Sequence, residues 1–261
     1  MQKVAIITGA SHGIGLATAN RLVDAGWKVF NISRSKCKTD RFESFEADVN
    51  DNAKIAEIFE LIFKNEGRID AVVNNAGFGI AGAIEETNPE NIDAIIKTNL
   101  SAVIKICGIA IPYLKQTNGK IVNISSVGGI IPLPYQACYS ATKSGVEVFS
   151  RALATEVRPF KIGVTSILPG DTKTNFTQAR VIDSQSNSSN YQRMTKSINK
   201  MARDEQKGKS PDSVAKVVLK VLRKRRPPLR KTVGFLSKTE VFLTRLVSTK
   251  LLNFIVRKIY G

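Results

Sequence analysis

The chain has 261 residues, of which 43% are apolar and 23% are charged, and this composition excludes a disordered or fibrous protein. Three widely spaced cysteines and a single histidine, His12, exclude a disulfide framework and a multi-histidine zinc site. The net charge of +17 is uneven, because residues 207–261 hold 15 basic and 2 acidic residues (+13), which leaves +4 for residues 1–206.

The N-terminus predicts no signal peptide, since Met1 to Lys3 lead directly into the apolar run that starts at Val4. No window holds 18 uninterrupted apolar residues, so we expect no membrane-spanning helix. Free thiols at Cys37, Cys107 and Cys138 are typical of a reducing compartment. We therefore expect a cytoplasmic protein without a metal site.

Short apolar runs alternate with longer segments of helical spacing along the first two-thirds of the chain. Strands are predicted at residues 3–8, 28–32, 42–47, 69–74, 120–125 and 162–168. Helices are predicted at residues 14–25, 51–66, 89–113 and 139–158. This alternation predicts a single doubly wound α/β domain of the Rossmann type, with a parallel sheet covered by helices on both faces.

The pattern changes after Thr174. Residues 176–209 are polar and predict a mobile loop over the sheet edge, next to the substrate. A helix at 211–224 precedes a basic, proline-interrupted stretch at 223–231. We thus expect a catalytic domain at residues 1–235 and a basic amphipathic helix at residues 236–261.

Two interpretations of this C-terminal helix remain open. A basic amphipathic helix is typical of a membrane-surface element. The alternative is that it packs on the domain or on another subunit. Nucleic acid is not expected as a partner, because no recognition motif accompanies the charge.

A glycine-rich turn, Thr8-Gly9-Ala10-Ser11-His12-Gly13-Ile14-Gly15, is expected where the first strand meets the first helix. Glycines there let the backbone approach a pyrophosphate, and the helix N-terminus offers free N–H groups. The alternative is a tight turn without a ligand. Its position in the first βαβ unit favours a dinucleotide site.

The spacing of this turn resembles the cofactor fingerprint of the short-chain dehydrogenase/reductase family. Further motifs follow in that family's order: Asn-Asn-Ala-Gly at residues 74–77, a Ser-Tyr-Lys set, and a Pro-Gly pair followed by a threonine. The resemblance covers about residues 1–175 and implies four catalytic residues, Asn99, Ser126, Tyr139 and Lys143. It also implies a cofactor site made by Gly9, Ser11, His12, Gly13, Ile14, Gly15, Asp48, Val49, Asn75, Ala76, Gly77, Tyr139, Lys143, Pro169, Gly170 and Thr174.

Elementary chemistry supports the same roles for three of these residues. Tyr139 and Lys143 lie four positions apart and therefore share one face of a helix. A nearby ammonium favours the phenolate, so we expect Lys143 to lower the pKa of Tyr139. Ser126, at a strand end, can donate to a substrate oxygen on which negative charge develops. Asn99 has an alternative role as a polar residue that bends its helix.

The choice of cofactor depends on the end of the second strand. An acid there would bind the ribose hydroxyl of NAD, whereas an arginine accommodates the 2′-phosphate of NADP. The sequence has Ser33 and then Arg34, with Lys36 and Lys38 adding positive charge. We therefore predict NADP(H).

Residues 74–86 and 126–143 resemble the hydroxysteroid and retinol dehydrogenase branch of the family. The resemblance implies hydride transfer between NADP(H) and an apolar carbonyl or alcohol, in a homodimer or homotetramer. One alternative function is a redox-inactive NADP-binding module that senses nucleotide or scaffolds a partner. Another is a peripheral lipid-binding protein that works through its basic tail.

Overall fold

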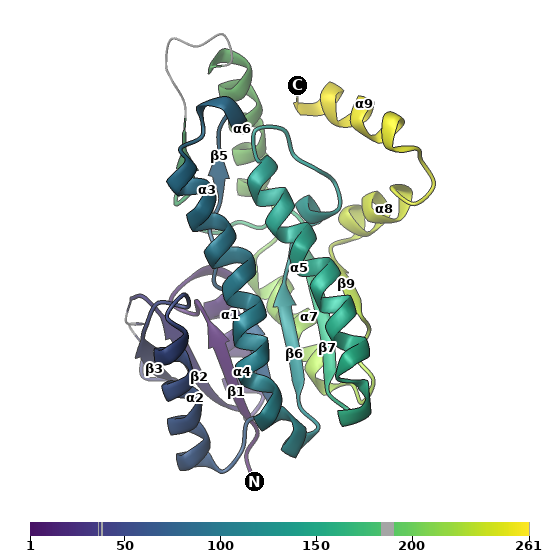
Figure 1. Ribbon diagram of the computed structural model, residues 1–261. Helices are drawn as coiled ribbons and strands as arrows, with labels where there is room; N and C mark the ends of the chain where they lie inside the picture. The colour runs from purple at the N-terminus through teal and green to yellow at the C-terminus, as the bar shows by residue number, and fades with distance from the viewer. Residues whose placement is uncertain (36, 38, 184–190, 261) are drawn as a thin grey trace.

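Seven parallel strands form one sheet at the centre of the computed structural model (Figure 1), which describes residues 1–35, 37, 39–183 and 191–260. The strands are β1 (Val4–Thr8), β2 (Lys28–Ser33), β3 (Glu43–Glu46), β4 (Ala71–Asn74), β6 (Lys120–Ile124), β7 (Gly163–Pro169) and β9 (Arg230–Val233). Their order is β3-β2-β1-β4-β6-β7-β9, and every pairing is parallel. The order reverses between β1 and β4, where ligands of such sheets bind. The predicted Rossmann-type fold is confirmed.

Helices cover both faces of the sheet. The first face carries α2 (Asn52–Glu66), α4 (Ala102–Thr117) and α5 (Ala137–Glu156), and the second carries α1 (Gly13–Asp24) and α7 (Pro211–Arg223). Each layer contributes its own apolar cluster, with Phe59 and Ile106 on one side and Leu22 and Val218 on the other. Because both faces are covered, β1 is buried throughout and its sequence is almost continuously apolar.

The predicted helix at 89–113 is a continuous helical segment from Pro89 to Thr117 that contains one irregularity. It consists of α3 (Pro89–Ile96), a π-helical turn (Lys97–Ser101) and α4. An 18-residue window of this segment has a mean hydropathy of 1.6, so the segment is long and apolar enough to cross a membrane by length and composition. A helix in the core of a globular protein can have the same composition. Val103, Ile106 and Leu114 pack into the apolar cluster beneath α4.

Two expectations for the C-terminal third are wrong. The basic stretch at 223–231, where no strand was predicted, leads into β9, which pairs with β7 and completes the sheet. Residues 176–209 are not only loop, because they include the two-residue strand β8 (Val181–Ile182), paired with β5 (Ile80–Ala81), and the helix α6 (Tyr191–Gln206). Residues 184–190, in the middle of the polar segment, lie outside the described residues.

The C-terminal extension contains two helices rather than one. They are α8 (Phe235–Leu243) and α9 (Thr249–Tyr260). Figure 1 shows them in yellow, joined by a bend and set apart from the two helical layers on the sheet. The remaining short elements are 3₁₀ turns at Ile84–Glu86, Val127–Gly129 and Arg158–Phe160.

Candidate active site

The glycine-rich turn between β1 and α1 has the backbone that a phosphate cradle needs. Gly9 and Gly13 adopt φ values of +70° and +58°, in the left-handed region that favours glycine. A Cβ on Gly15 would overlap the carbonyl oxygen of Gly9. The turn therefore accepts no side chain at these points, and it leaves the N-terminus of α1 open to an anion.

Asn75 shapes this turn. Its side-chain amide donates to the carbonyl oxygens of Thr8 and Gly9, both at 3.0 Å. The Thr8 hydroxyl accepts in return from the backbone N–H groups of Asn75 and Ala76, at 3.0 and 3.1 Å. The motif at residues 74–77 thus holds the cradle from the neighbouring strand, a positioning role that the predicted cofactor contact did not include.

A cavity of about 520 Å³ adjoins the turn on the side of β2. Ser11 and His12, two of the predicted cofactor residues, line it together with Ser35 and Arg41. The glycine cradle and this cavity fit the phosphate and adenosine half of a nicotinamide dinucleotide. Arg34 is exposed at the end of β2 and does not line the cavity. Lys36 and Lys38 lie outside the described residues.

Two residues near this cavity were not predicted. Arg41 lines it and is held by Asp24, through an ion pair, and by Asn20 at 3.1 Å. It is the next arginine after Arg34, which is the signal that could have found it. Asn31, buried in β2, accepts from the backbone N–H of Ala10 at 2.8 Å and fixes the turn from beneath.

The π-helical turn places Asn99 at the centre of the site. Its amide donates to the carbonyl of Phe78 at 2.8 Å, and its oxygen accepts from the Phe78 N–H at 3.1 Å. A Cβ on Gly77 would lie 2.9 Å from the Asn99 oxygen and 3.7 Å from Lys143 Nζ. Gly77 therefore allows Asn99 and Lys143 to approach each other, and π-helical turns often mark functional sites.

Ser126, Tyr139 and Lys143 come together where β6 ends and α5 begins. The Ser126 hydroxyl accepts from the Gly128 N–H at 3.0 Å. Lys143 Nζ donates to the Ile124 carbonyl at 2.9 Å and lies 5.8 Å from the centre of the Tyr139 ring. Both Tyr139 and Lys143 are buried. The structure thus brings the three predicted residues into one site.

Burial dominates the electrostatics of this set. It raises the pKa of Tyr139 to about 12, although the Ser126 hydroxyl acts in the opposite direction. It lowers the pKa of Lys143 to about 8. The expected lowering of the Tyr139 pKa is therefore wrong for this structure, because burial of the phenol dominates its pKa.

The remaining predicted cofactor residues divide into two groups. Thr174 approaches the cradle, since a Cβ on Gly13 would lie 3.5 Å from it. Pro169 ends β7, and Gly170 packs against Ser237 of α8. Ile14 and Val49 belong to the apolar clusters, and Asp48 accepts from the Asn50 N–H at 2.9 Å near the end of β3.

Apolar side chains enclose Tyr139 on its outer side. Phe176 lies over the phenol with its ring centre 5.6 Å away. The cluster around Tyr139 consists of Phe78, Ile80, Ile95, Cys138, Phe176 and Val181. Behind Phe176, the almost fully buried guanidinium of Arg180 pairs with Glu205 of α6. The surroundings of the Tyr139 phenol are therefore mainly apolar.

Comparison with known proteins agrees with this geometry. The model of the short chain dehydrogenase family matches residues 3–185. A 3-ketodihydrosphingosine reductase of Bacteroides thetaiotaomicron is 36% identical over 89% of this chain and 88% of its own length. A 3-oxoacyl-[acyl-carrier-protein] reductase of Thermotoga maritima is 35% identical over 67% of this chain and 76% of its own.

Solved structures are similar over almost the whole chain. A short-chain dehydrogenase from Streptomyces avermitilis superposes with a TM-score of 0.84 at 28% identity and covers 99% of this chain and 97% of its own. A 3-ketoacyl-(acyl-carrier-protein) reductase from Brucella melitensis, complexed with NADH, reaches 0.74 at 27% identity and covers 88% and 96%. The fold as a whole therefore has structural counterparts among solved short-chain dehydrogenases and reductases.

Proposed function

Because the chain belongs to the short-chain dehydrogenase family, we propose that it is an NADP(H)-dependent reductase of an apolar, long-chain carbonyl compound. As a member of that family it is an oxidoreductase that acts on the CH–OH group with a nicotinamide cofactor. One observation carries the proposal: a protonated phenol, Tyr139, stands beside Ser126 in an apolar enclosure.

The protonation of Tyr139 suits the reductive direction. With a pKa of about 12, its hydroxyl keeps its proton at neutral pH and can give it to a substrate oxygen. The Ser126 hydroxyl donates to the same oxygen as negative charge develops there. The bound cofactor supplies the hydride. The Lys143 ammonium favours the phenolate that the proton transfer leaves behind.

Asn99 acts as a positioning residue in this scheme. Its two hydrogen bonds fix the backbone of Phe78, which packs in the apolar cluster around Tyr139. The π-helical turn directs the Asn99 side chain toward Gly77 and Lys143. The residue thus connects the cofactor side of the site with the substrate side.

The preference for NADP(H) rests on the charge at the end of β2. Ser33 ends the strand, so no carboxylate stands where one would bind the ribose hydroxyl of NAD. Arg34 follows directly, and Arg41 lines the adjoining cavity. Two guanidinium groups suit a 2′-phosphate, which accepts charge-assisted hydrogen bonds.

The substrate class rests on the enclosure of Tyr139 and on the relatives. Six apolar or weakly polar side chains surround the phenol, as an apolar ligand requires. The relatives from Bacteroides and Thermotoga are named as reductases of 3-ketodihydrosphingosine and of a 3-oxoacyl compound. A 3-keto lipid is therefore preferred over the steroid or retinoid that the sequence resemblance implied.

We place this activity in the cytoplasm, on the ground that Cys37, Cys107 and Cys138 are all unpaired. We also propose a homodimer or homotetramer, because α4 and α5 expose Ile104 and Val148. Light scattering on the purified chain tests the assembly.

The first test is absorbance at the reduced-nicotinamide band. NADPH or NADH is mixed with the protein and with 3-ketodihydrosphingosine, a 3-oxoacyl thioester, a ketosteroid or retinal. We expect turnover with NADPH and a 3-keto lipid. Turnover with NADH alone would overturn the cofactor assignment, and nucleotide binding without any turnover would favour the redox-inactive module.

A further inference from the structure

Large apolar side chains are concentrated on the two C-terminal helices. Of the 19 exposed large hydrophobic residues among the described ones, nine lie between residues 235 and 259. They are Phe235, Leu236, Phe242, Leu243, Leu246, Leu251, Phe254, Ile255 and Ile259. Phe235 and Leu236 are 77% and 75% exposed. The other ten are spread over the rest of the described chain, and two of them, Ile104 and Val148, belong to the faces of α4 and α5 named above for self-association.

The helix α9 has more apolar surface than the rest of the protein covers. Val256 is buried and Leu252 is half-buried, so one face packs against the body. Leu251, Ile255 and Ile259 recur every four residues on the adjacent face and are exposed. This second stripe on α9 has no cover within the described chain and needs a partner outside it.

The charge around this surface is almost entirely positive. Five cations accompany the apolar residues, namely Lys238, Arg245, Lys250, Arg257 and Lys258, whereas Glu240 is the single acid after residue 231. The ion pairs found among the described residues include none of these five cations. A complementary partner is therefore apolar and anionic at once.

We propose that α8 and α9 form a docking surface for an anionic lipid bilayer. The exposed apolar side chains enter the boundary between head groups and acyl chains, and the surrounding lysines and arginines contact the lipid phosphates. The proposal goes beyond the reductase activity. It selects the membrane-surface interpretation of the C-terminal segment, because a purely internal packing would not leave nine large apolar residues exposed.

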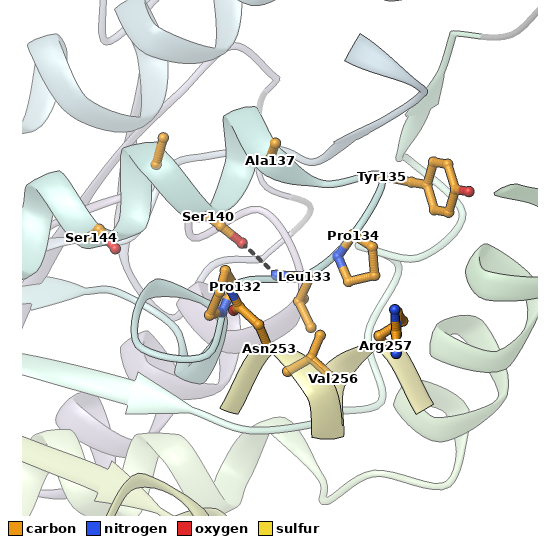
Figure 2. A pocket seen from close by; sticks show the side chains of 11 residues that line it. Pro132, Leu133, Pro134, Tyr135, Ala137, Ser140, Ser144, Asn253, Val256 and Arg257 are labelled. Carbon is orange, nitrogen blue, oxygen red and sulfur yellow. Dashed lines mark hydrogen bonds between the residues drawn. The ribbon is translucent and has the colours of Figure 1, made fainter. Parts of the chain in front are cut away.

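A groove beside α9 connects this surface with the active site. A cavity of about 560 Å³ lies between Val256 and Asn253 of α9 and the loop Pro132–Pro134 (Figure 2). Leu133 lines it, and the same side chain would lie 3.2 Å from a Cβ on Gly128. That Cβ would also lie 3.3 Å from the Ser126 hydroxyl and 3.6 Å from the Tyr139 ring.

The Leu133 side chain thus separates the groove from Ser126 and Tyr139. Docking through α9 places an apolar groove at the bilayer, one side chain away from Tyr139. If the reductase proposal holds, the bilayer is also where a 3-keto lipid resides.

The test is sedimentation of the full-length protein with lipid vesicles, without substrate or cofactor. Vesicles of phosphatidylcholine alone are compared with vesicles that also contain phosphatidylglycerol. We expect binding to the anionic vesicles, and release as the salt concentration rises. Failure of wild-type protein to bind anionic vesicles would overturn the docking surface and leave the reductase proposal intact.

Two variants separate the apolar and the charged contributions. Leu251→Ser/Ile255→Ser/Ile259→Ser and Lys250→Glu/Arg257→Glu/Lys258→Glu should each lower the partition coefficient about tenfold or more. The matched control, Leu61→Ser/Lys64→Glu, alters exposed residues of α2 and should bind like wild type. Unchanged secondary structure by circular dichroism verifies the fold of each variant.

The competing occupant is a second copy of this chain. Light scattering of the triple serine variant distinguishes the two, because an interface between copies would lose its assembly with those substitutions. If the triple serine variant keeps its oligomeric state but no longer binds vesicles, the result supports docking on a bilayer. A smaller assembly with unchanged vesicle binding overturns the proposal.

Discussion

Lys143 lies beside Tyr139, and its ammonium donates to a backbone carbonyl. Its Nζ donates to the Ile124 carbonyl at 2.9 Å and lies 5.8 Å from the centre of the Tyr139 ring. Burial lowers the pKa of Lys143 and raises that of Tyr139, so it shifts both groups toward their neutral forms. A phenol that keeps its proton near an easily deprotonated ammonium suits proton donation, and it makes the site sensitive to alkaline pH.

The first prediction concerns the phenol. Tyr139→Phe removes the proton donor and keeps the ring that packs under Phe176. We expect turnover to fall about 10²- to 10⁴-fold, the usual contribution of a positioned acid, with NADPH affinity unchanged. Steady-state rates and nucleotide fluorescence titration measure the two effects. Tyr113→Phe, which alters a phenol packed against Phe59 and Phe63, is the matched control.

The second prediction concerns pH. The Lys143 pKa is about 8, so its ammonium predominates below that pH and is lost above it. We expect kcat/KM for reduction to be level on the acidic side and to fall about tenfold per pH unit above about pH 8. Tyr139, with a pKa of about 12, adds no break in this range. An arginine keeps its charge at alkaline pH, so the Lys143→Arg variant should not show the fall in kcat/KM above about pH 8. If the fall persists in this variant, it does not arise from Lys143.

The third prediction concerns cofactor choice. Arg34→Ala and Arg41→Ala should each raise KM for NADPH about tenfold or more and leave KM for NADH nearly unchanged, because a charge-assisted bond to the 2′-phosphate is lost. Initial rates measured with each cofactor give the ratio of KM for NADPH to KM for NADH. Lys54→Ala, on the exposed side of α2, is the control. An equal rise for NADH would show that the arginines only maintain the fold.

The fourth prediction concerns the cradle. Gly15→Ala forces a methyl group against the Gly9 carbonyl, so the turn must open. We expect nucleotide binding to be lost in calorimetric titration, while the far-ultraviolet circular dichroism stays native. Gly108→Ala meets no atom within 4 Å and should bind nucleotide normally. Normal binding by both variants would place the dinucleotide elsewhere.

Features set by local spacing could be predicted from the sequence. The Gly-rich turn follows from its place after an apolar strand, and Tyr139 and Lys143 share a helix face whatever surrounds them. The edge strand β9 was missed because only Thr232 and Val233 of it are buried, which leaves no apolar run to recognise. In α6, Met194, Ile198 and Met201 repeat at helical intervals, but the polar residues around them obscured the pattern.

Other features of the site depend on contacts between distant segments. The π-helical turn places Asn99 against the backbone of Phe78, 21 residues earlier, and no local motif encodes that contact. The pKa of Tyr139 depends on burial to which Phe176, from the segment after β7, contributes. The spacing of Tyr139 and Lys143 therefore could not predict the pKa of Tyr139, because this pKa depends on burial by distant segments.

The last prediction concerns the ion pair behind Phe176. The Arg180 side chain is 1% exposed and pairs with Glu205, which also accepts from the Thr177 hydroxyl. Glu205→Ala leaves a buried guanidinium without its partner, and we expect a loss of about 3–5 kcal/mol in the free energy of unfolding, measured in urea. Replacing both residues by apolar ones, Arg180→Met/Glu205→Leu, should recover most of that loss. If the double variant is as unstable as Glu205→Ala, the pair fixes the path of the chain over Tyr139 through geometry that apolar packing cannot replace.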